Sequence, residues 1–255
     1  MIKMRIIPTL LLCNSGLSKT KKFSKPKYVG DPINTVRIFN DKEVDELIIL
    51  DICATKESRE PDLGVIRDIA SECFMPLSYG GGVTNLDIIR EVLSSGVEKI
   101  VINSAAVRQK KLITESSKYF GSSTIVVSID AKRKLFGGYE VYINSGQEKT
   151  GLDPVEWAKE CERLGAGEIV INSIDQDGMM QGYDWQLIRS VADAVSLPVV
   201  AAGGAGTLND LVRAIKECKV SAAAAGSLFI FHGKHRAVLV NYPNSIDLAA
   251  AMDVS

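Results

Sequence analysis

The segment 128–133, Ser-Ile-Asp-Ala-Lys-Arg, puts a carboxylate where parallel α/β proteins place their chemistry. It overlaps the end of 123–129, a short β-branched apolar run typical of a strand that is buried on both faces. Asp130 is therefore predicted at the C-terminal end of a strand, the edge at which ligands bind in such folds. An aspartate in this position can also do no more than cap a turn, and for a single residue that alternative stays open.

The rest of the chain alternates strands with amphipathic helices. Residues 154–163 have helical periodicity, with Asp153 as N-cap and Pro154 at the first helical position. Strict alternation predicts a parallel sheet with right-handed crossovers. Eight such units in 255 residues, without a Pro/Gly/Ser-rich linker, predict one (β/α)8 barrel domain over 1–255. The eight expected strands are about 5–12, 46–51, 75–79, 99–103, 124–129, 168–172, 198–202 and 221–225.

An internal repeat divides the barrel in two. Similar segments begin at 31 and 153, at 46 and 168, and at 76 and 198, so each pair is separated by 122 residues. The chain is therefore expected to consist of half-barrels at about 1–122 and 123–235, followed by a divergent tail at 232–255. Corresponding sites of the two halves should face each other at the C-terminal end of the barrel, which we call the mouth.

Each half carries glycine and serine segments directly after its third and fourth strands. Backbone N–H groups beside glycine can approach an anion closely, helix N-termini attract negative charge, and serine adds a hydroxyl donor. Each glycine cluster is expected to open a helix. A glycine pair can also serve only a tight turn, but the repetition favours a ligand with a phosphate at each end. The first cradle comprises Gly81, Gly82, Asn103 and Ser104, and the second comprises Gly203, Gly204, Gly226 and Ser227.

Composition excludes several other classes of function. The chain has 30 basic and 31 acidic residues, and this balance suggests neither a nucleic-acid-binding surface nor a polybasic membrane-binding patch. No stretch approaches the roughly 20 apolar residues that span a bilayer, so a soluble protein is expected. Five scattered cysteines without a C-x-x-C pair suggest reduced thiols in a cytoplasm, and His232 and His235 cannot form a metal site alone. We expect neither a metal nor a cofactor.

Eight stretches carry a resemblance: 45–51, 79–82, 99–103, 129–133, 165–168, 173–178, 182–184 and 202–206. Over nearly the whole chain, to about residue 230, the sequence resembles a known family, the HisF cyclase subunit of imidazole glycerol phosphate synthase. The resemblance implies a (β/α)8 barrel that receives ammonia from a HisH-like glutaminase docked on the N-terminal face. It also implies a lyase and cyclase activity in histidine biosynthesis, in which a bisphosphorylated ribulosyl substrate is cleaved and cyclised.

The resemblance implies that Asp130 is one of two catalytic carboxylates acting as general acid and base. The second belongs at the end of the first strand, where this chain has Leu11. The half-barrel repeat also aligns Leu11 with Asp130. Losing one such group commonly costs on the order of 10²–10⁴ in rate, which puts ring closure in question. Lys19, Asp177 and Gly178 are implied as substrate contacts.

At the opposite end the family's ammonia gate is present in full. Its four residues, Arg5, Glu46, Lys99 and Glu168, precede or begin strands one, two, four and six. A charge before a strand is usually only a solvated flank, but the set of four is read as a ring that admits a small neutral molecule. The interior beyond this gate is expected to be lined by Ser78, Ser128 and Ala201.

The tail after residue 231 departs from the family and resembles a HisF-like branch associated with surface-polysaccharide genes. Two main hypotheses follow. The chain is either a HisF-type synthase subunit, or an ammonia conduit that supplies a third, ATP-dependent amidotransferase acting on a nucleotide-linked sugar in lipopolysaccharide biosynthesis. A phosphosugar isomerase of the related HisA type is a further alternative, although such an enzyme would also require a carboxylate on strand one.

Overall fold

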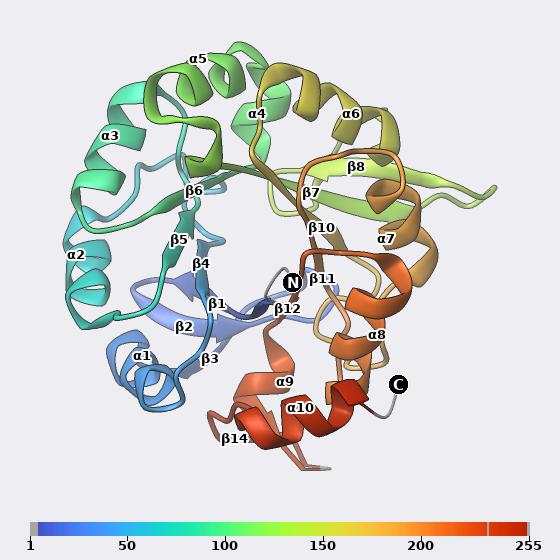
Figure 1. Ribbon diagram of the computed structural model, residues 1–255. Coiled ribbons are helices and arrows are strands. Elements are labelled where there is room, and N and C mark those ends of the chain that lie inside the picture. The colour runs from blue at the N-terminus through green and yellow to red at the C-terminus, as the bar shows by residue number, and fades with distance from the viewer. Residues whose placement is uncertain (1–4, 234, 254–255) are drawn as a thin grey trace.

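The computed structural model describes residues 5–233 and 235–253 and contains a closed barrel of eight parallel strands (Figure 1). The predicted (β/α)8 fold is confirmed. Residues 1–4, 234 and 254–255, which the predicted domain includes, lie outside the described residues. Strand β12 pairs with β1, which closes the ring. In order around the barrel the strands are β1 (Arg5–Cys13), β4 (Leu47–Asp51), β5 (Leu77–Gly80), β6 (Lys99–Ile102), β7 (Ile125–Arg133), β10 (Glu168–Ser173), β11 (Val199–Ala202) and β12 (Ala222–Ala225).

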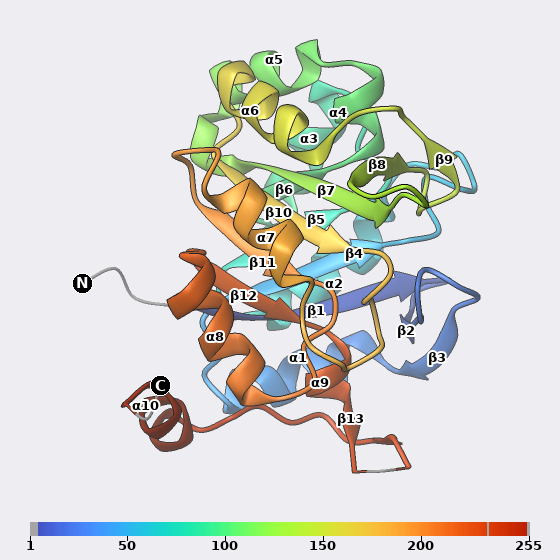
Figure 2. The same cartoon turned by 90° about the vertical axis from the view of Figure 1, so that its right-hand side faces the viewer.

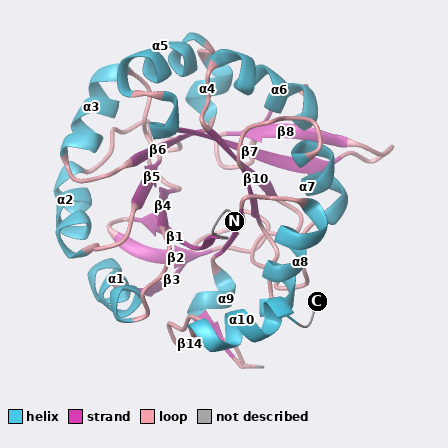
Figure 3. Cartoon of the chain, in the orientation of Figure 1, coloured by secondary structure: helices cyan, strands magenta, loops and turns pink. Residues whose placement is uncertain are grey.

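Helices surround the barrel on its outer side, as the cyan ring in Figure 3 shows. Their apolar faces pack against the outward-facing side chains of the strands, which places the larger core between the two layers. The helices are α1 (Pro32–Asp41), α2 (Leu63–Glu72), α3 (Leu86–Ser94), α4 (Ser104–Arg108), α5 (Lys111–Phe120), α6 (Pro154–Leu164), α7 (Trp185–Ala192), α8 (Leu208–Cys218), α9 (Ser227–Ile230) and α10 (Ser245–Asp253).

The helix starts follow local capping chemistry. Asp153 accepts hydrogen bonds from the backbone N–H groups of Val155 and Glu156, with Pro154 in the first turn as predicted. Asp31 and Pro32 begin α1 in the same way, at the equivalent position of the first half. The repeated sequence therefore produces the same local structure in both halves.

Short additional strands lie at the mouth. They are β2 (Gly16–Lys19), β3 (Lys27–Gly30), β8 (Tyr139–Ile143) and β9 (Glu148–Lys149). In the side view of Figure 2 they lie at the end opposite the N-terminus. The strand expected at 124–129 is longer than predicted. Strand β7 instead runs on to Arg133 because its end pairs in antiparallel fashion with β8. The tail forms β13 (Phe231–His232), β14 (Ala237–Val238) and α10.

The barrel interior holds a second, smaller apolar cluster. Val200 belongs to this inner cluster, whereas Ala201 packs with the outer one. Our prediction that Ala201 lines the interior is therefore wrong: successive strand residues alternate between faces, and the apolar run of β11 conceals which set points inward. The inner cluster consists of Ile7, Ile48, Val101, Val126, Val170, Val200, Ala222 and Ala224.

None of the helices within the described ranges combines the length and the apolar character needed to cross a lipid bilayer.

Candidate active site

A cavity of about 390 Å³ occupies the mouth of the barrel. It is formed by the C-terminal ends of the barrel strands and the segments that follow them. Every residue predicted at this end lines it: Leu11, Lys19, Gly81, Gly82, Asn103, Ser104, Asp130, Asp177, Gly178, Gly203, Gly204, Gly226 and Ser227. The structure thus brings together residues spread over more than 200 positions of sequence.

Asp130 lies at the wall of this cavity between two amide side chains. Asn103 donates from Nδ2 to Oδ2 over 3.0 Å, and Asn172 donates from Nδ2 to Oδ1 over 3.0 Å. Burial raises the pKa of Asp130 to about 7, against the opposing effect of these two donors. A carboxyl group that titrates near neutral pH can both accept and donate a proton, as a general acid–base group must.

Asn172 is a site residue that we did not predict. It stands beside Asp130 because β7 and β10 pair in that register. The 122-residue repeat relates Asn172 to Leu50, and Leu50 pairs with Leu11 on β4 and β1. A comparison of the ends of β7 and β10 with the ends of β1 and β4, the equivalent strands of the first half, would have identified Asn172 from the sequence. One quarter of the mouth therefore carries Asp130 and Asn172, while the equivalent quarter carries two leucines.

Lys19 reaches into the mouth from β2. Its Nζ donates to the carbonyl oxygen of Thr9 over 2.8 Å, and the side chain is almost fully buried. Burial lowers the pKa of Lys19 to about 8, although Asp177 favours its charged form. A Cβ atom at Gly226 would lie 2.3 Å from Nζ and 3.0 Å from the carbonyl oxygen of Thr9, so a side chain there would displace the lysine from its present position.

Asp177 ties the segment after β1 to the far side of the mouth. Its carboxylate accepts a hydrogen bond from Thr20 Oγ1 at 3.0 Å, and its carbonyl oxygen accepts one from Lys22 N at 2.9 Å. Burial raises the pKa of the Asp177 carboxyl, while Lys19 and Thr20 oppose that rise. Lys19 and Asp177 therefore influence each other electrostatically beside the second cradle, with no direct ion pair between them among the described contacts.

The glycines of both cradles are required by packing as well as by any ligand. A Cβ atom at Gly81 would lie 2.3 Å from the carbonyl oxygen of Asp51, and one at Gly203 would lie 2.3 Å from Asn172 Oδ1. Both residues have positive φ angles, 115° and 80°. Close packing against the neighbouring loops thus explains part of the glycine pattern without a ligand.

Our expectation that each glycine cluster opens a helix fails in the first half, where two residues separate Gly82 from the N-cap of α3, and holds in the second, where the N-cap of α8 directly follows Gly206. The starts of α3 and α8 are capped by Asn85 and Thr207, whose side chains accept hydrogen bonds from Ile88 N and Asp210 N. Helices α4 and α9 do begin at Ser104 and Ser227, with no side-chain cap. The uncapped N–H groups near the two cradles therefore belong to the short helices.

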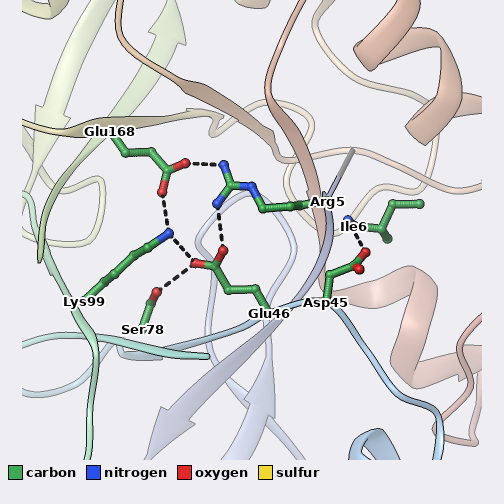
Figure 4. A network of polar contacts seen from close by, with 7 residues as sticks. All are labelled: Arg5, Ile6, Asp45, Glu46, Ser78, Lys99 and Glu168. Carbon is green, nitrogen blue, oxygen red and sulfur yellow. Dashed lines mark hydrogen bonds and ion pairs between the residues drawn. The ribbon is translucent and has the colours of Figure 1, made fainter. Parts of the chain in front are cut away.

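The gate forms a closed ring of alternating charges at the N-terminal end of the barrel (Figure 4). Arg5 donates to Glu46 over 2.7 Å and also to Glu168. Lys99 Nζ lies 2.9 Å from Glu46 Oε1 and 3.1 Å from Glu168 Oε2. Both carboxylates are buried, and Ser78 Oγ donates to Glu46 over 3.1 Å. Each gate charge thus has two partners of opposite sign.

The inner apolar cluster separates this gate from the mouth. Ser78 belongs to the gate end through its bond to Glu46, and Ser128 lines the mouth cavity. Between them the barrel interior is filled by aliphatic side chains. An ion placed in such a layer would lose its hydration without gaining a partner.

Our expectation that all five cysteines are reduced thiols is wrong for two of them. Cys13 and Cys53 form a disulfide at the edge of the mouth, with Cα atoms 5.3 Å apart, while Cys73, Cys161 and Cys218 are free. No spacing rule could show this pairing. The cysteines are 40 residues apart and meet only because β1 and β4 are neighbours.

No group of three or more His, Cys, Asp and Glu side chains within the described residues is arranged to hold a metal ion. His232 and His235 are exposed on the tail.

Comparison with known proteins gives a consistent assignment. The family described as "Histidine biosynthesis protein" matches residues 5–236. The Pseudomonas aeruginosa protein named "Putative imidazole glycerol phosphate synthase subunit hisF2" is 50% identical over 250 residues, covering 97% of this chain and all of the relative. A Leptospira interrogans protein named "Putative imidazole glycerol phosphate synthase subunit HisF" is 48% identical over 251 residues, covering 98% of this chain and 99% of the relative.

A third relative, named "Imidazole glycerol phosphate synthase subunit HisF", comes from Alkaliphilus metalliredigens. It is 41% identical over 232 residues, covering 91% of this chain and 92% of the relative. Likeness at this level over nearly full length, together with the barrel and its mouth, assigns the family. The chain belongs to the HisF family of histidine biosynthesis proteins.

Proposed function

We propose that this chain is the HisF-type synthase subunit of a cytoplasmic glutamine amidotransferase complex. A HisH-like glutaminase docks on the N-terminal face and releases ammonia at the gate. Ammonia crosses the barrel and reacts at the mouth with a bisphosphorylated ribulosyl substrate, as in imidazole glycerol phosphate synthase. The observation that carries this proposal is that one barrel has the charged gate at one end and the Asp130 cavity at the other.

The residues of the mouth support this chemistry. Asp130 titrates near neutral pH and can move protons to and from the substrate. The two cradles are proposed to bind the two phosphates, with Lys19 and Asp177 at the second one. The apolar layer favours ammonia over ammonium, since burial of an unpaired charge is costly.

The test is turnover of the bisphosphorylated ribulosyl substrate by the purified chain with ammonium salts, and with glutamine when the glutaminase is present. The wild type is expected to turn over, and Asp130→Asn is expected to lose on the order of 10²–10⁴ in rate. Asp87→Asn, on the exposed face of α3, is the matched control and should behave as wild type. A wild type that is inactive under both conditions would contradict the proposal.

Binding of anions tests the cradles separately from the chemistry. Crystals soaked in sulfate are expected to hold one ion at each cradle. Empty density at both would count against a bisphosphorylated ligand, whatever the turnover.

A second candidate function rests on Leu11. Leucine cannot transfer a proton, and its partner Leu50 extends the apolar wall. The chain would then conduct ammonia to a third, ATP-dependent amidotransferase that acts on a nucleotide-linked surface sugar. In support, the relatives with 44–50% identity carry names qualified as putative, two of them numbered hisF2 and hisF3.

The variant Leu11→Asp/Leu50→Asn separates the two candidates, because it copies the Asp130 and Asn172 pair into the first half. If the chain is a conduit, the wild type should lack turnover and the double variant should gain it. Robust wild-type turnover would eliminate the conduit function.

A further inference from the structure

The disulfide between Cys13 and Cys53 lies at a point where two loops of the mouth leave neighbouring strands. Cys13 ends β1, and Cys53 follows β4 by two residues. Leu12 pairs with Asp51 in the parallel ladder, and Ile52 N donates to Leu12 O over 3.0 Å. The strands thus hold the two sulfur atoms within reach of each other in either redox state.

Both loops wall the mouth cavity. The segment 14–31 follows Cys13 and carries Lys19 and Thr20, and the segment 54–62 follows Cys53 and carries Thr55 and Lys56. Beyond β2 and β3, segment 14–31 is joined to the far side of the mouth by hydrogen bonds such as Thr20 to Asp177. The disulfide is its covalent attachment to the neighbouring loop.

The two cysteines differ in exposure. Cys53 is 8% exposed and its backbone N–H is held by Asp51 Oδ1, whereas Cys13 is more exposed. A second cavity, of about 310 Å³, is lined by Leu12, Asn14 and Asp51, which are close in sequence to the two cysteines, although neither cysteine lines it. Attack at Cys13, with Cys53 leaving, is the accessible direction.

We propose that Cys13 and Cys53 are a reversible redox modification site whose co-reactant is a low-molecular-weight thiol or its disulfide, and whose state decides whether segment 14–31 is tied to the mouth. On oxidation, the two thiols lose two protons and two electrons and form one S–S bond. The co-reactant disulfide accepts these two electrons and two protons, so that its S–S bond breaks and two thiols form. Reduction is the reverse, through a mixed disulfide on Cys13 that Cys53 or a second thiol resolves.

The reversibility rests on the cytoplasmic location in the proposed function, because disulfides that occur there are commonly transient and redox-sensing. The free cysteines differ from this pair. Cys161 and Cys218 are buried, and burial raises the pKa of both thiols, which keeps them unreactive. Only the pair at the mouth couples thiol chemistry to the loops that bind the ligand.

The experiment equilibrates the purified full-length chain in glutathione buffers of graded redox ratio, then alkylates it in denaturant and locates the labels by mass spectrometry. In oxidising buffer we expect label on Cys73, Cys161 and Cys218 alone, and in reducing buffer on all five cysteines. Hydrogen exchange of segment 14–31 should be about tenfold faster in the reduced form.

Two variants complete the design. In every buffer, segment 14–31 of Cys13→Ser should exchange as fast as in the reduced wild type. Cys73→Ser is the control, and its exchange should match that of the wild type in the same buffer. Label on all five cysteines in every buffer, glutathione retained on Cys13 without closure, or equal exchange of 14–31 in both forms would overturn the proposal. Neither measurement uses substrate or glutaminase, so failure of the proposed function would leave these outcomes unchanged.

Discussion

At the scale of single residues, the surroundings of Asp130 determine its chemistry. A carboxylate on a strand end would titrate near 4 in water, and here burial raises its pKa to about 7. Asn103 and Asn172 counter that rise by donating to the charged form. The residue is therefore poised for proton transfer at a cost to the stability of the folded chain.

That cost predicts a pH dependence. Between about pH 4 and pH 7 the folded state binds a proton on Asp130 that the unfolded state has lost, so stability falls as pH rises through this range. Asp130→Asn removes the titration. In urea denaturation, the free energy of unfolding of the variant minus that of the wild type should be larger at pH 8 than at pH 5. A constant difference between the two pH values would show that the carboxyl is not perturbed.

Gly81 gives a second prediction at this scale. Gly81→Ala places a methyl group 2.3 Å from the carbonyl oxygen of Asp51, at a φ of 115°. Gly137→Ala is the matched control, because its φ is also positive, at 90°, but nothing lies within 4 Å of the added atom. Conformational strain alone costs about 1–3 kcal/mol, so thermal unfolding should place Gly81→Ala clearly below the control. Equal losses would mean that the loop after β4 yields easily.

At the scale of elements, the mouth depends on how the loops after β1 and β4 are joined. The disulfide closes a loop of 40 residues that includes β2, β3 and α1. Chain entropy in the unfolded state gives such a crosslink a stabilising effect of up to about 4 kcal/mol.

Urea unfolding of the oxidised wild type and of Cys13→Ser/Cys53→Ser should therefore differ by about 2–4 kcal/mol. The reduced wild type should match the double variant. If the oxidised wild type and the double variant unfold at the same urea concentration, the crosslink does not form in solution.

At the scale of the whole molecule, the barrel connects two sites of opposite character. The gate is charged and paired throughout, the interior is apolar, and the mouth is polar on one side and apolar on the other. Because Glu46 and Glu168 are both buried, removing a gate cation leaves carboxylates with fewer partners.

This arrangement predicts how gate variants behave. Lys99→Met should reduce the product formed per glutamine hydrolysed, with a loss of stability of up to about 3 kcal/mol from the unpaired carboxylates. The charge-balanced control, Lys99→Met/Glu46→Gln, should recover part of the stability but not the coupling. Assays with ammonium salts alone should be affected less than assays with glutamine. Coupling that stays at the wild-type level in both variants would exclude a gate role for Lys99.

The positions of the eight barrel strands, the helix cap at Asp153 and most of the residues around the mouth were readable from the sequence. They depend on local signals: β-branched runs, capping side chains and a 122-residue repeat. Tertiary structure decided the rest. Asn172 reached Asp130, Cys13 met Cys53, and Val200 rather than Ala201 turned inward because strands distant in sequence pair in one particular register. The closed gate likewise needs four strand starts brought to one end of the barrel, and no local pattern specifies those contacts.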